Sequence, residues 1–202
     1  MFDERQYDKV LKTISIEKAN QVGLKIILPV FLLFTIPHVL LHGEAMLAYF
    51  RTASDPMTYL RDGAVFLAAF FIGIVLHECI HGVTWALFAP GGFRSIRFGV
   101  LWKYLTPYCH CTEPLKIKHY RLGALMPALL LGLIPAVAGV AVGEYRITLF
   151  GIFFITAAIG DFMVIHLLKD EKADDYALDH PSEAGCFVYR RRSNPFDSHP
   201  KM

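Results

Sequence analysis

Four long apolar runs restrict this chain of 202 residues to a small set of folds. Each run is close to the ~20 residues that an α-helix needs to cross about 30 Å of hydrocarbon. Pro29 and Pro37 interrupt the first run, so a kinked or partly re-entrant helix is one interpretation of it. The sequence therefore predicts an all-α membrane bundle with about four transmembrane helices. The runs extend approximately over Leu24–Leu41, Gly63–Phe88, Leu122–Val142 and Ile147–Leu168.

The amino-acid composition is typical of an integral membrane protein. Hydrophobic residues make up 54% of the chain, and the mean hydropathy is +0.42. A soluble domain is usually less apolar and carries its charges more evenly over the surface. The formal net charge is only +2 and no long basic block is present, so a nucleic-acid partner is not expected.

The distribution of lysine and arginine predicts how the chain is oriented in the membrane. Most of these residues lie before the first run, between the second and third runs, and after the fourth run. The other two loops carry only Arg51, Arg61 and Arg146. Because positive loops favour the cytoplasmic side, both termini and the middle loop are predicted to be cytoplasmic.

The middle loop and the tail have structure-forming patterns of their own. Gly91 and Gly92 make a turn, and the aromatic and branched residues of Phe93–Tyr104 suit a strand. We expect a short cytoplasmic β-hairpin-like loop between the second and third helices. Residues 1–168 are then expected to form one membrane-embedded domain, and residues 169–202 a polar cytoplasmic tail that contains a short strand or is flexible.

The second apolar run carries the motif His77-Glu78-Cys79-Ile80-His81. Two histidines four residues apart lie one turn apart on one face of a helix, where both imidazoles can bind one zinc ion. Zinc lowers the pKa of a bound water to about 7. Glu78, beside the first histidine, can take the proton from that water and later pass it to the leaving amine.

The location of the motif strengthens this interpretation. Ionisable side chains inside an apolar run are costly and usually functional. The competing interpretation is that His77 and His81 are core histidines, hydrogen-bonded to neighbouring helices.

Asp161 is the predicted third zinc ligand, because a catalytic zinc site usually has three protein ligands. It is the only acidic residue in the fourth apolar run. A rise of about 1.5 Å per residue places His81 and Asp161 both about 10 Å from the cytoplasmic ends of their helices, and His77 at about 16 Å. The alternative is an aspartate that reaches toward water or pairs with a lysine.

Other groups are weaker candidates for the third ligand. His166 faces another side of its helix, and Glu144 lies at the opposite membrane surface. The compact group Cys109, His110 and Cys111 lacks a second Cys or His pair, so ordinary loop residues are the preferred interpretation. Among the remaining histidines, His110 and His119 can help to bind substrate, whereas His38 and His42 fall on the far side and are expected to bind no metal.

These residues resemble the motifs of a known family. The chain resembles the zincin peptidases of membranes, a family related to the site-2 proteases, over roughly Gly63 to Leu168. The resemblance is carried by His77-Glu78-Cys79-Ile80-His81-Gly82, by Pro114, Tyr120-Arg121 and Pro127, and by Gly160-Asp161.

The resemblance implies a zinc-dependent peptidase of the membrane. It implies that His77 and His81 bind zinc, that Glu78 is the catalytic base and that Asp161 matches the aspartate which a later helix supplies in site-2 proteases. One departure is that Phe162, and not glycine, follows Asp161.

Three functions are therefore compared. The first is a metallopeptidase with one Zn²⁺ per chain that cleaves a membrane-protein or peptide substrate in or near the membrane. The second is a non-catalytic membrane protein that uses the metal for structure or sensing, although such a site has no need of Glu78. The third is an ion-conducting protein, which four helices without an internal repeat make less attractive.

Overall fold

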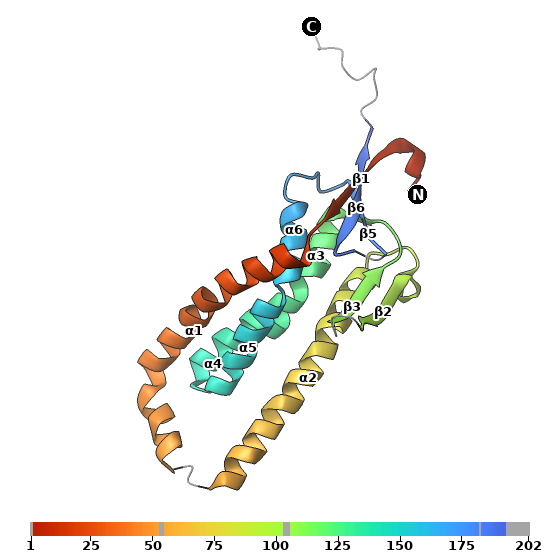
Figure 1. Ribbon diagram of the computed structural model, residues 1–202. Coiled ribbons are helices and arrows are strands. Elements are labelled where there is room, and N and C mark those ends of the chain that lie inside the picture. Colours follow the sequence, from red (N-terminus) through yellow and green to blue (C-terminus); the bar gives the residue numbers. More distant parts are fainter. Residues whose placement is uncertain (1, 53–54, 103–105, 182, 193–202) are drawn as a thin grey trace.

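The computed structural model describes residues 2–52, 55–102, 106–181 and 183–192. Two long helices, α1 (Ile16–Thr52) and α2 (Pro56–Ala86), diverge from their connection, with α4 (Ile134–Val142) and α5 (Tyr145–Ala157) between them (Figure 1). The strands gather at the other end of the molecule (Figure 1). This arrangement separates an apolar helical body from a mixed α/β end.

Four helical segments are long and apolar enough to cross a membrane, as the four apolar runs predicted. They are Gln21–Ala48, Pro56–Ala86, Ile117–Val142 and Tyr145–Leu167. Very little of the most apolar part of the first two is buried, and large side chains such as Leu40 and Leu60 are exposed. Apolar faces of this extent suit lipid contact and would be a liability in water.

The first two spans are continuous helices. Pro29 and Pro37 lie within α1, which bends along its length, as expected where proline removes a helical hydrogen bond (Figure 1). At the start of α2 the Asp55 side chain accepts a hydrogen bond from the Met57 backbone N–H at 3.1 Å, and Pro56 occupies the first turn. Both features are typical of a helix N-terminus, and they start α2 before the predicted residue Gly63.

The third and fourth spans are interrupted helices. The third consists of α3 (Ile117–Pro127), a π-helical segment η3 (Ala128–Leu133) and α4. Pro135 lacks the N–H that the carbonyl four residues earlier would accept, which favours the wider turn. The fourth span consists of α5 and α6 (Ile159–Leu167), which meet at Ala158. Because of this break, Asp161 lies in the first turn of a short helix.

The predicted hairpin between the second and third spans is present. Strands β2 (Ile96–Leu101) and β3 (Thr106–Cys111) pair antiparallel, from Ile96 opposite Cys111 to Leu101 opposite Thr106. A Cβ atom on Gly82 of α2 would come within 2.5 Å of the Phe98 ring, so this glycine leaves room for the hairpin to pack on the helix. The hairpin therefore lies beside α2, directly after the His-Glu motif. Tyr104, the predicted end of the first strand, is outside the described residues.

A second sheet makes the all-α prediction only approximate. Its order is β1-β6-β5-β4 and each described pair is antiparallel. Two of its strands come from the tail and one from the N-terminal segment, so both ends of the chain meet in one sheet; residues 193–202 are outside the described part. The strands are β1 (Tyr7–Thr13), β4 (Leu115–Lys116), β5 (Tyr176–Asp179) and β6 (Gly185–Arg191), and short 3₁₀ turns occur at η1 (Glu4–Gln6) and η2 (Gly92–Ser95).

The buried core joins this sheet to the ends of α2, α3 and α6. Trp85, Ile117, Leu168 and Val188 are among its members. At its edge the buried carboxylate of Glu171 accepts two hydrogen bonds from the Arg190 guanidinium, at 2.8 and 2.9 Å, and also pairs with Lys12. The hydrogen bonds from Arg190 lower the pKa of Glu171 to about 2, helped by Lys12 and against the effect of burial. One carboxylate thus fastens the turn that follows α6 to β1 and β6.

Glu171→Gln is expected to destabilise the fold by about 3 kcal/mol at pH 7, because it breaks a buried ion pair. The folded-state pKa is below the unfolded value near 4.5, so this stabilisation is present above pH 4.5 and is lost as the pH falls toward 2. Thermal unfolding of the detergent-purified protein between pH 7 and pH 3 measures it. Asp174→Asn, at a largely exposed carboxylate, is the control and should change little. A pH-independent effect of Glu171→Gln would contradict the assignment.

Candidate metal centre

Helix α2 places both predicted histidines on one face. His77 and His81 are one turn apart, their ring centroids are 4.9 Å apart, and both side chains are buried. Gly73, one turn before His77, has no side chain between α2 and α5. A Cβ there would come within 2.6 Å of Phe154, whose ring stacks near the His77 imidazole. Gly73 therefore leaves room on α2 for the Phe154 ring, which lies beside the first histidine.

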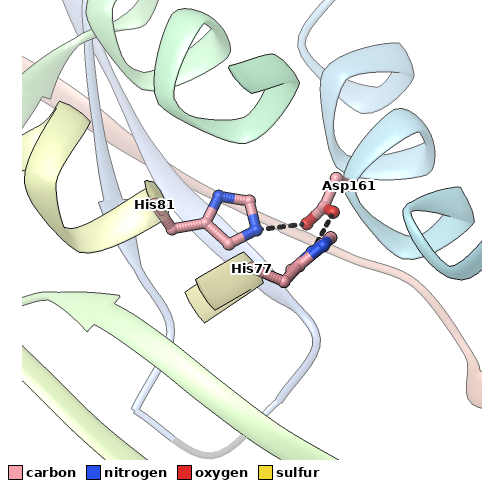
Figure 2. A group of neighbouring side chains, drawn as sticks. All are labelled: His77, His81 and Asp161. Carbon is pink, nitrogen blue, oxygen red and sulfur yellow. Dashed lines mark hydrogen bonds and ion pairs between the residues drawn. The ribbon is translucent and has the colours of Figure 1, made fainter. Parts of the chain in front are cut away.

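Asp161 approaches these histidines from α6. Its two carboxylate oxygens lie 3.2 Å from His77 Nε2 and 3.3 Å from His81 Nε2, and Figure 2 shows both imidazoles directed at the same carboxylate. One potential ligand atom from each residue lies within 4.8 Å of the others. Within the described part of the chain, His77, His81 and Asp161 form the one group of three or more His, Cys, Asp and Glu side chains whose ligand atoms are close enough to hold a metal ion. The structure thus brings together three residues that the sequence predicted to be ligands.

The hydrogen bonds of His81 fit a cation at this position. The carbonyl oxygen of Gly123 lies 2.9 Å from His81 Nδ1, and a carbonyl only accepts, so Nδ1 carries the proton. In the neutral ring, Nε2 then presents a lone pair to the Asp161 carboxylate. Two facing acceptors repel each other unless a cation lies between them or the ring is protonated. An imidazole nitrogen whose partner nitrogen donates to a backbone carbonyl is the arrangement typical of a zinc-binding histidine.

Glu78 faces the same cavity as the three grouped residues. The cavity has a volume of about 620 Å³ and is lined by residues of α2, α6, β3 and the β5–β6 turn. The backbone N–H of Cys109, on β3, is directed at the Glu78 carboxylate. A carboxylate beside a potential metal site, in a cavity of this size, has the position of a general base for an activated water.

An aromatic stack supports His81 on the side of the mixed α/β end. The Trp85 ring is parallel to the His81 ring, with centroids 5.1 Å apart and an angle of 15°. Tyr120 stacks on the other face of Trp85 at 5.3 Å, and its carbonyl accepts a hydrogen bond from Trp85 Nε1 at 3.1 Å. The sequence analysis gave Trp85 no role. The signal that was available is its spacing of four residues from His81, on the same helical face.

Asp179 was also missed as a residue of the site. It ends β5, and its carboxylate lines the same cavity. One oxygen accepts the Cys111 backbone N–H at 2.7 Å and the other accepts the Tyr120 hydroxyl. Burial raises the pKa of Asp179, and the hydrogen bonds from Tyr120 and Cys111 partly offset this effect. The sequence analysis assigned residues 169–202 to a tail apart from the site, because no local pattern shows that β5 returns to the site.

The other candidates lie in positions that suit roles other than metal binding. Cys109 and His110 line the cavity, but the Cys109, Cys111 and His110 side chains are not in the close group of ligand atoms. Burial raises the pKa of Cys111 to about 11, so this thiol stays protonated at neutral pH and is a poor ligand. His119 is stacked on Phe88 at 4.0 Å and does not line the cavity.

The remaining histidines and Glu144 are also outside the close group. His38 is fully buried at the other end of the bundle, where its Nδ1 lies 3.1 Å from Thr148 Oγ1. His42 Nε2 lies 2.8 Å from the Val140 carbonyl oxygen. Both side chains tie α1 to the α4–α5 pair.

Comparison with known proteins gives one match. The model of a family described as "Putative zincin peptidase" matches residues 70–176, which is more than half of the chain and includes the His-Glu motif and Asp161. No curated protein and no solved structure matches the chain.

His77→Ala and Asp161→Ala should each remove a bound metal, because a three-ligand site rarely retains zinc with two. The measurement is zinc per chain after chelator-free purification in detergent. We expect about one zinc ion in the parent protein and much less in both variants. His166→Ala, on the same helix as Asp161, is the matched control and should keep the zinc. Zinc retained by the Asp161 variant would exclude this carboxylate as a ligand.

Proposed function

Because the chain belongs to this zincin peptidase family, we propose that it is a membrane-embedded zinc metallopeptidase. The observation that carries the proposal is the convergence of His77, His81 and Asp161 at a cavity that Glu78 also lines. Four apolar helices support the membrane location. Together they describe a polar site enclosed by helices that are suited to lipid.

In the proposed site the two His Nε2 atoms and a carboxylate oxygen of Asp161 would hold the zinc ion. When bound, zinc lowers the pKa of a water ligand to about 7 and polarises the scissile carbonyl. Gly123 fixes the His81 ring through Nδ1, which leaves Nε2 free to act as a ligand.

Glu78 moves the proton in this mechanism. A carboxylate oxygen of Glu78 accepts a proton from the attacking water, whose oxygen bonds to the carbonyl carbon of the substrate. As the carbon–nitrogen bond breaks, Glu78 gives the proton to the nitrogen of the leaving segment. The products are a new carboxylate and a free amine, and Glu78 returns to its initial state.

The substrate is proposed to be a membrane protein or peptide that adopts an extended conformation. Strand β3 lines the cavity, and its described partner on one side is β2. An extended segment can lie along the other edge of β3 and donate its N–H groups to the main-chain carbonyls of that edge. The carbonyl to be cleaved would then lie close to Glu78, because the Cys109 N–H on this edge already faces that carboxylate.

The site is proposed to open toward the cytoplasm. The loops rich in lysine and arginine join the same end of the helices as both sheets, and positive loops favour the cytoplasmic side. Both termini are then cytoplasmic, and water reaches the site from that side.

Glu78→Gln should keep the zinc and lose cleavage, because the amide preserves the shape but does not accept the proton. The expected loss is on the order of 100-fold or more, as is typical for a missing general base. A co-expressed single-span substrate library with a tag on each side of the span measures cleavage by immunoblot. Glu171→Gln is the control, because it lowers stability but lies outside the cavity. If it still cleaves, a loss of cleavage in Glu78→Gln is not an effect of lower stability. A Glu78→Gln protein that cleaves at the parental rate would contradict the mechanism.

A further inference from the structure

Asp179 joins three segments that are distant in the sequence. It ends β5, accepts the backbone N–H of Cys111 on β3 at 2.7 Å and accepts the hydroxyl of Tyr120 on α3. The two partners are 68 and 59 residues away along the chain. Both carboxylate oxygens are therefore engaged, and each bond leads toward a different part of the proposed site.

The hydrogen bond from the Tyr120 hydroxyl connects Asp179 to His81. Tyr120 is buried and stacks on Trp85, which stacks on His81 with an angle of only 15° between the rings. The Gly123 carbonyl fixes the His81 ring within its plane through Nδ1, and Trp85 covers one face of it. Asp179 holds the far end of this stack through the Tyr120 hydroxyl, so it limits how far Trp85 and His81 can tilt together.

The hydrogen bond from the Cys111 N–H connects Asp179 to the strand edge that faces Glu78. Residues two apart on a strand direct their N–H groups to the same edge, so the N–H groups of Cys109 and Cys111 share one edge of β3. Asp179 binds the Cys111 N–H, and the Cys109 N–H is directed at Glu78. The position of Asp179 thus sets the distance between this strand edge and the Glu78 carboxylate.

We propose that Asp179 is a positioning residue that aligns both the zinc ligand His81 and the base Glu78. The proposal rests on the roles given to these two residues in the proposed function. It makes the sheet formed by the chain ends part of the catalytic unit. A change in the position of β5, which belongs to the tail, would then also change the position of His81 and Glu78.

Supporting residues of this kind typically change metal affinity or activity by roughly 10- to 100-fold when they are removed. The variants are Asp179→Asn, whose amide oxygen can still accept the Cys111 N–H but which faces the Tyr120 hydroxyl with an NH2 group in place of the charged acceptor, and Tyr120→Phe, which removes the hydroxyl but leaves the Cys111 bond possible. Asp174→Asn is the matched control, because its carboxylate is exposed on the same part of the chain.

The full chain is purified in detergent, loaded with cobalt(II) or zinc, and measured in three ways. Asp179→Asn should shift the visible cobalt bands, release zinc to a chelator roughly 10- to 100-fold faster, and lower kcat by a similar factor with little change in KM. Tyr120→Phe should shift the bands in the same direction. The double variant should be no worse than Asp179→Asn alone, because both changes act on the same bond between Tyr120 and residue 179. Asp174→Asn should match the parent.

Unchanged cobalt bands and zinc release in both variants, with only a lower melting temperature, would overturn the proposal and leave Asp179 a purely structural role. If Asp179→Asn does not fold, Tyr120→Phe decides by the same measurements. If the parent binds cobalt and zinc but cleaves nothing, the proposed function fails. The cobalt bands and the zinc release rate then still show whether Asp179 positions His81.

Discussion

The approach of Asp161 to His77 and His81 is the interaction on which the rest of this structure depends. It places a carboxylate about 3.2 Å from two imidazole nitrogens in a region enclosed by apolar helices. Charged groups are costly in such surroundings unless they are paired or bind a metal. The break at Ala158 directs Asp161 inward, and Gly73 leaves room on α2 for the Phe154 ring of α5. Both features serve to bring two membrane spans to one point.

The mixed α/β end complements this helical body. The hairpin packs on Gly82, beside the histidines, and the second sheet connects to it through Asp179. The apolar outer faces of α1 and α2 suit lipid, whereas the cavity that holds the His77, Glu78 and Asp161 side chains opens among strands that can contact water. A site of this kind reconciles hydrolysis, which needs water, with a chain that is largely apolar. The strands are therefore as necessary to the proposed chemistry as the spans.

The predictable part of the molecule follows from regular helical geometry. The spacing of His77 and His81 and the matched depth of Asp161 need only 3.6 residues per turn and a rise of 1.5 Å per residue, and the structure brings these side chains together. Trp85 is four residues from His81 on the same helix, so its place beside the site could have been found from that spacing. The roles of Tyr120 and Asp179 depend on how strands β3 and β5 return to the helices. No local pattern encodes contacts across 59 or 68 residues, so these residues were not recognised as part of the site. The helix break at Ala158 was missed for a similar reason, because it carries neither proline nor glycine.

X-ray absorption at the zinc edge of the purified parent protein tests the central claim most directly. The account predicts a first shell of nitrogen and oxygen atoms at about 2.0–2.2 Å, with the outer-shell scattering of two imidazoles. Scattering from sulfur at about 2.3 Å would instead place the ion on cysteines. That result, or a protein that takes up no zinc, would contradict a centre built from His77, His81 and Asp161.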